Sequence, residues 1–132
     1  MKKEVIVSKK MPKPGGHYSQ AIRLGNLIFT SGQTAKDPNS REVLFPGDIE
    51  AQTDVIMKNI KNLLEESGSS LSNIIKASIF INDQKKFQLF NDTYKKYFPK
   101  DPPVRTTIAT GNFDQGVCIE IDVIAFIDID ID

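Results

Sequence analysis

This 132-residue sequence is poor in the residue types that build covalent cross-links and metal sites. It contains one cysteine, Cys118, and one histidine, His17. A single cysteine excludes an intrachain disulfide, and one Cys with one His cannot supply the ligands of a zinc cluster. We therefore expect no metal ion, and we interpret Cys118 as an ordinary strand residue.

Long apolar runs and an excess of either charge are also missing. No apolar stretch approaches the length of a membrane span, and the first residues lack the apolar core of a signal peptide. Basic and acidic side chains both number 17, so the formal net charge is zero. This balance argues against a general nucleic-acid partner, which would need a basic excess. We expect a cytoplasmic protein with no membrane partner, although the sequence leaves an organellar address open.

Arginine is scarce as well, because only Arg23, Arg41 and Arg105 are present among the basic residues. Arg105 lies in an apolar and β-branched run, residues 104–109, that predicts a strand. The fixed fork of a guanidinium fits a carboxylate or phosphate through two hydrogen bonds. Arg105 could therefore bind an anionic ligand, or it could form an ordinary structural ion pair.

The apolar pattern predicts one α+β domain spanning residues 1–132. Strands are expected at residues 4–8, 19–24, 27–31, 73–82, 104–109 and from 117 onward. Asp48 is expected to cap a helix that runs to about Ser67, and Asp83 a second helix that Pro99 ends. The order β-β-β-α-β-α-β-β predicts a sandwich with both helices on one face of a mixed sheet.

We expect the last two strands to form a hairpin with Thr107 opposite Glu120 and Arg105 diagonal to it. In this arrangement the three side chains share the face away from the helices. The same face carries Ile124 and Phe126, which predicts that a second copy of the chain covers it. Arg105 and Glu120 could form a plain salt bridge, or an anion-binding Arg could lie beside an acid–base Glu.

Several other polar residues could belong either to a ligand-binding site or to a purely structural contact. Asn91 lies on an otherwise aromatic helix stripe, where a buried amide needs partners. Tyr18, Ser31 and Gly32 lie in polar, glycine-containing segments where a ligand could approach the backbone closely. Each of these residues could instead stabilise a turn or a loop.

Taken together, these segments resemble the RidA (YjgF) family of reactive-intermediate deaminases. The resemblance covers nearly the whole chain. The matching residues are Gly16–Ile22, Phe29–Gln33, Gln52, Thr53, Asn59, Phe87–Asn91, Tyr94, Pro103–Thr107 and Ile119–Ile121. The chain departs from the usual family pattern at His17, where a proline is common, and at Thr107, where a cysteine is common.

The resemblance implies a chorismate-mutase-like homotrimer with three sites in the clefts between subunits. It implies cofactor-independent hydrolysis of enamines and imines, such as 2-aminoacrylate, to 2-keto acids and ammonia. Arg105 would hold the substrate carboxylate and Glu120 would handle the attacking water. Tyr18, Ser31, Gly32, Asn91 and Thr107 would line the pocket.

Two other functions stay open at this point. The same cleft could sense or sequester a small carboxylate without turning it over. Alternatively, the protein could cleave RNA or inhibit translation, as reported for some family members, although the zero net charge argues against this. The acidic end, residues 128–132, is expected to be an exposed or frayed strand end, and no role is assigned to it.

Overall fold

The computed structural model describes residues 1–128, which form six strands and two α-helices together with short 3₁₀ turns. The strands are β1 (Glu4–Ile6), β2 (Ala21–Leu24), β3 (Leu27–Thr30), β4 (Ile74–Ile81), β5 (Val104–Ala109) and β6 (Ile119–Phe126). The helices are α1 (Ile49–Glu66) and α2 (Phe87–Tyr94). The predicted element order is confirmed, whereas four of the five residues of the acidic end, 129–132, lie outside the described part.

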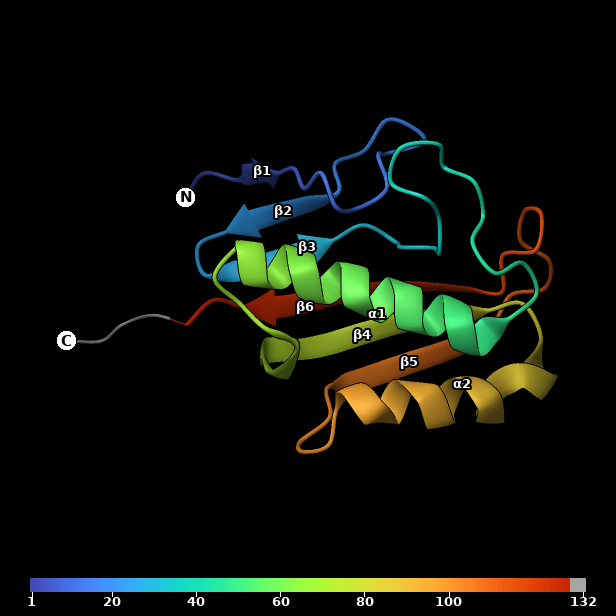
Figure 1. Ribbon diagram of the computed structural model, residues 1–132. Helices are drawn as coiled ribbons and strands as arrows, with labels where there is room; N and C mark the ends of the chain where they lie inside the picture. Colours follow the sequence, from blue (N-terminus) through green and yellow to red (C-terminus); the bar gives the residue numbers. More distant parts are fainter. Residues whose placement is uncertain (129–132) are drawn as a thin grey trace.

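The strands form one mixed sheet in the order β1-β2-β3-β6-β4-β5. Only the pair formed by β4 and β5 is parallel. Parallel neighbours need a crossover connection, and α2 provides it. Figure 1 shows α1 and α2 on the same side of the sheet, as the sequence predicts.

Local signals explain where α1 begins and ends. The Asp48 carboxylate accepts a hydrogen bond from Ala51 N at 3.0 Å, which satisfies one of the free donors of the first turn. Gly68, just after the helix, adopts φ +84°, a conformation that glycine takes without a steric penalty. Asp83 accepts from Lys85 N and so caps a 3₁₀ turn that precedes α2, rather than α2 itself.

The core lies between the sheet and the helices. Along β6, the residues from Ile119 to Ala125 alternate strictly between buried and half-buried positions. The buried set packs under α1, whose apolar face includes Ile56, Ile60 and Leu64. No helix in residues 1–128 is long and apolar enough to cross a membrane.

The predicted hairpin between the last two strands is wrong. Strand β4 separates them, because it pairs in parallel with β5 on one side and antiparallel with β6 on the other. Segment 110–118 therefore crosses the end of β4, although its glycines resemble those of a hairpin turn. In this register Thr107 is level with Ile79, and Glu120 is level with Phe80.

Candidate functional site

Arg105 on β5 turns its side chain toward α2, so the prediction that it faces away from the helices is wrong. Its Nη1 donates a hydrogen bond to Asn91 Oδ1 at 2.8 Å. The guanidinium carbon lies 5.6, 5.5 and 5.0 Å from the ring centroids of Phe87, Phe90 and Tyr94. Aromatic faces attract a cation, so the rings and the amide together fix the direction of the guanidinium.

The structural ion pair that the sequence left open for Arg105 is absent from residues 1–128. Ion pairs within 4.0 Å join only Lys10 to Glu66 and Lys95 to Asp92 in this range. Arg105 and Asn91 instead line a cavity of about 280 Å³ between α2 and the loop before β5. The guanidinium therefore keeps donors that can bind an anion.

Thr107 lies two residues along β5 from Arg105 and faces the same side of the sheet. Its hydroxyl oxygen is buried and has no hydrogen-bond partner in the described chain. A buried polar atom without a partner is uncommon in a folded protein. We call Asn91, Arg105 and Thr107 the Arg105 cluster.

Glu120 lies on β6 and faces the opposite side of the sheet, as predicted. Its side chain packs against Gly32, where an added Cβ would come within 2.5 Å of Glu120 Oε2. The backbone fixes this approach, because Gln33 N donates to Ile121 O at 2.8 Å and Ile121 N donates to Gln33 O at 3.0 Å. Only glycine leaves room for the carboxylate at position 32.

Tyr18 and Ser31 lie close to Gly32 around a small polar cavity. Ser31 Oγ donates to Gln20 O at 3.1 Å and accepts from Gln33 Nε2 at 3.0 Å. The Tyr18 hydroxyl accepts from Gly15 N at 3.0 Å, and Tyr18 is an exposed residue. We call Tyr18, Ser31, Gly32 and Glu120 the Glu120 cluster.

The surroundings of Glu120 favour its protonated form. Burial raises the pKa of the carboxyl above its ordinary value, and the negative charge of Asp122 raises it further. Asp122 lies on the same face of β6, two residues away. The positive charge of Lys36 acts in the other direction and lowers the pKa. A carboxyl group whose pKa is raised by burial is a candidate for acid–base chemistry.

The described chain thus brings the predicted site residues together in two groups rather than one. The Arg105 cluster faces the helices, and the Glu120 cluster faces the open side of the sheet. Since β4 separates β5 from β6, Arg105 and Glu120 of one chain do not meet across neighbouring strands. A site that uses both residues needs a second copy of the chain.

Comparison with known proteins shows which family has these features. The model of the endoribonuclease L-PSP family matches residues 8–127. A RutC family protein of Pyrococcus abyssi is 41% identical over 126 residues, covering 96% of this chain and 98% of the relative. The chain belongs to the endoribonuclease L-PSP (YjgF/RidA) family.

Solved RidA-family structures share the whole fold. A Rid family protein of Yersinia pestis superposes with a TM-score of 0.88 at 35% identity, covering 96% of this chain and 100% of its own. Escherichia coli TdcF, solved with bound serine, superposes with a TM-score of 0.85 at 30% identity, covering 95% of this chain and 99% of its own. The fold predicted from the sequence is confirmed.

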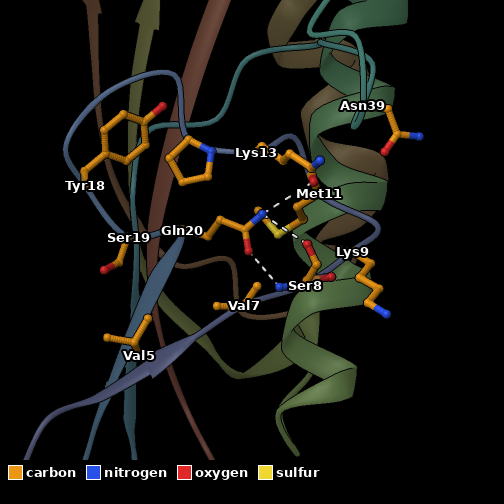
Figure 2. Close-up of a pocket in the computed structure, with 11 residues that line it drawn as sticks. Val5, Val7, Ser8, Lys9, Met11, Lys13, Tyr18, Ser19, Gln20 and Asn39 are labelled. Carbon is orange, nitrogen blue, oxygen red and sulfur yellow. Dashed lines mark hydrogen bonds between the residues drawn. The ribbon is translucent and has the colours of Figure 1, made fainter.

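In this RidA-family chain, Gln20 supports the Glu120 cluster in a way that sequence reasoning missed. Its buried amide accepts from Ser8 N at 2.7 Å and donates to Ser8 O at 3.1 Å and Pro12 O at 3.0 Å. Figure 2 shows this amide beside an apolar cavity of about 450 Å³ that Val5, Val7 and Met11 line. Tyr18 lines this cavity as well, so the cavity adjoins the Glu120 cluster, although neither Arg105 nor Glu120 lines it.

Sequence reasoning also missed Lys36 and Arg41, which line the polar cavity beside Ser31 and Gly32. Arg41 adopts φ +62°, a left-handed conformation that costs a residue with a Cβ about 1–2 kcal/mol. The only available signal was the scarcity of arginine, because Lys36 and Arg41 lie in a loop without periodicity.

Proposed function

We propose that this RidA-family protein is a cofactor-independent deaminase that hydrolyses enamines and imines of the 2-aminoacrylate type. The products are a 2-keto acid and ammonia. One observation carries the proposal: the Arg105 guanidinium is held by Asn91 and three aromatic rings, yet no carboxylate pairs with it in residues 1–128. Such a group is suited to holding the carboxylate of a small substrate.

The proposed site lies between subunits of a homotrimer, where the Arg105 cluster of one copy meets the Glu120 cluster of another. Contact with a second copy is supported by the open face of the sheet, which exposes Phe29 on β3 and Ile108 on β5. Its half-buried residues include Ile124 and Phe126 on β6. An apolar face of this kind is typical of a surface that another subunit covers.

The reaction needs few protein groups. Water adds to C2 of the imine while the nitrogen takes a proton, and the resulting carbinolamine then releases ammonia as the C2–O double bond forms. Arg105 would fix the carboxylate next to C2. Glu120 would take a proton from the water and return one to the leaving nitrogen, a task that its raised pKa favours. Ser31 and Tyr18 would orient the water through their hydroxyls.

The test compares the wild-type protein with Arg105→Ala and Glu120→Gln. A dehydratase acting on serine supplies 2-aminoacrylate in the presence of semicarbazide, which traps the free imine. The wild-type protein should divert the imine to pyruvate before it is trapped, and both variants should divert far less. Unchanged diversion by Arg105→Ala would sink the proposal.

A binding module is the alternative that the same cleft supports, since TdcF was solved with bound serine, a small amino acid with a carboxylate. Titration with stable 2-oxobutanoate separates the two functions. An enzyme loses turnover in Glu120→Gln and keeps binding, whereas a pure binder shows no turnover to lose. Endoribonuclease activity, which the family description names, would be supported only by RNA cleavage that Glu120→Gln abolishes.

A further inference from the structure

Lys36 and Arg41 form a pair of positive charges on the Glu120 side of the proposed site. Both line the small polar cavity with Ser31 and Gly32. Both also line an adjoining open groove of about 460 Å³, whose lining includes the carboxylates of Glu42 and Asp114. The two cations therefore separate the Glu120 cluster from a second space that is open to a ligand.

Arg41 is held in place rather than free in solvent. Its Nη1 donates a hydrogen bond to Lys13 O. Its guanidinium also lies directly against Gly15, where any side chain would collide with it. Together with the left-handed backbone at φ +62°, these contacts orient an arginine at a position where glycine would be easier to accommodate.

Neither charge is neutralised by an ion pair. No carboxylate oxygen lies within 4.0 Å of Lys36 or Arg41 in residues 1–128. The nearby Asp37 carboxylate instead accepts from Asn39 N and Ser40 N, both at 2.9 Å. An oriented Arg41 and a neighbouring Lys36, neither of them in an ion pair within 4.0 Å, can bind an anion at the edge of a cavity.

We infer that Lys36 and Arg41 bind a second carboxylate, at the far end of the substrate whose first carboxylate Arg105 holds. This inference rests on the proposed function and narrows its substrate class to dicarboxylic 2-imino acids. A carboxylate fits better than a phosphate dianion, because the carboxylates of Glu42 and Asp114 in the same groove repel a larger negative charge more strongly.

Equilibrium titration of the intact oligomer with two stable keto acids tests this directly. The probes are 2-oxobutanoate, with one carboxylate, and 2-oxoglutarate, with two. The wild-type protein should bind 2-oxoglutarate about tenfold more tightly, since a charge-assisted hydrogen bond contributes at least that much. Lys36→Met and Arg41→Gly should reduce the ratio of the two affinities to near one.

Two further variants make the result specific. Arg41→Gly relieves the left-handed backbone, so its effect cannot be ascribed to misfolding. Gly15→Ala keeps every charge but places a Cβ where the guanidinium lies, so it should reduce the same ratio. Lys61→Met removes an exposed charge from α1 and should leave the ratio at its wild-type value.

Three results would overturn the inference. The wild-type protein could bind the two keto acids equally, or its preference could survive in Lys36→Met and Arg41→Gly. The variants could also lower the affinities for 2-oxobutanoate and 2-oxoglutarate by the same factor. For Lys36→Met, this would mean that Lys36 acts only through the charge of Glu120. If the wild-type protein turns over 2-aminoacrylate but does not prefer 2-oxoglutarate, this inference alone is refuted. If it prefers 2-oxoglutarate but turns over no imine, only the proposed deaminase function is refuted.

Discussion

Arg105 and Glu120 lie on strands that flank β4 and face opposite sides of the same sheet. Arg105 is level with Ala77, whose side chain is fully buried beneath the helices. Glu120 is level with Phe80, which faces the open side. Side chains alternate between the two faces along a strand, and Ala77 and Phe80 are three residues apart, so they point to opposite faces. No rotamer of Arg105 or Glu120 can therefore bring these two side chains together within one chain.

Mixing two inactive variants should therefore restore activity. If the proposed homotrimer forms, Arg105→Ala and Glu120→Gln subunits that are unfolded together and refolded as a mixture should give mixed trimers in which one cleft combines an intact Arg105 with an intact Glu120. If subunits mix at random, recovery should approach about a quarter of the wild-type rate, because three in four trimers then carry one intact cleft of three.

Deamination of 2-aminoacrylate is the measurement, and the double variant Arg105→Ala/Glu120→Gln is the control. Refolding the double variant with either single variant can produce no intact cleft. A mixture of the single variants that stays inactive, although mass spectrometry shows mixed trimers, would mean that the two residues do not share a site.

Glu120→Gln should make the protein more stable at neutral pH. Burial and the charge of Asp122 raise the pKa of Glu120 in the folded chain above its ordinary value of 4.5, although Lys36 opposes them. Above the folded pKa the ionised group therefore costs stability, and this cost disappears as the pH falls below 4.5. Glutamine avoids the cost.

Urea unfolding at fixed protein concentration measures this difference. The midpoint of Glu120→Gln should exceed that of the wild-type protein at pH 7, and the two should converge near pH 4. Glu65→Gln, at an exposed position on α1, removes the same charge and provides the comparison. A variant that is less stable than the wild type at pH 7 would show that Glu120 has a stabilising partner in the assembly.

Loss of the hydroxyl should change the stability of the protein differently at Tyr97 and at Tyr94. Tyr97 donates to Asp54 Oδ1 at 2.5 Å and so links this region to α1. Tyr97→Phe should lower the free energy of unfolding by about 1 kcal/mol. The Tyr94 hydroxyl is buried without a partner in the described chain, and burial raises the pKa of Tyr94 to about 12.

Tyr94→Phe should therefore be neutral or slightly stabilising, since it removes an unsatisfied polar atom. Denaturant unfolding of both variants gives the comparison, and each serves as the control for the other. A cost for Tyr94→Phe as large as that for Tyr97→Phe would reveal a partner for the Tyr94 hydroxyl in the assembled protein.

Gly32→Ala should abolish deamination while the fold persists. The new methyl group would lie 2.5 Å from Glu120 Oε2, so the carboxylate must move out of the Glu120 cluster. Turnover should fall at least as far as in Glu120→Gln, with circular dichroism unchanged. Full activity in Gly32→Ala would show that the position of this carboxylate does not matter to the reaction.

Much of the fold could be predicted because its signals are local. Asp48 and Gly68 mark the ends of α1 through chemistry within one helical turn. The alternation from Ile119 to Phe126 identifies β6 and separates its two faces. The position of Asn91 on an aromatic helix stripe indicated that its amide needs a hydrogen-bond partner, and the structure shows that Arg105 is this partner. The ends of α1 and the two faces of β6 depend on neighbours close in sequence or on a simple period.

The main error in the sequence interpretation concerned which strands are neighbours. Segment 110–118 has the glycines of a hairpin turn, yet it crosses the end of β4. Pairing between distant strands depends on the crossover through α2 and on the position of β4 between β5 and β6. Neither can be recognised from the residues of segment 110–118. Arg41 was missed for a similar reason, because its orientation depends on Gly15 and Lys13.

The sequence by itself determined the family, the set of elements and the residues that carry the proposed chemistry, because composition, period and motif are properties of the chain. Only the tertiary structure decided that Arg105 faces the helices, on the side of the sheet opposite Glu120. The face of a side chain follows from strand order and register, which depend on contacts between residues far apart in sequence.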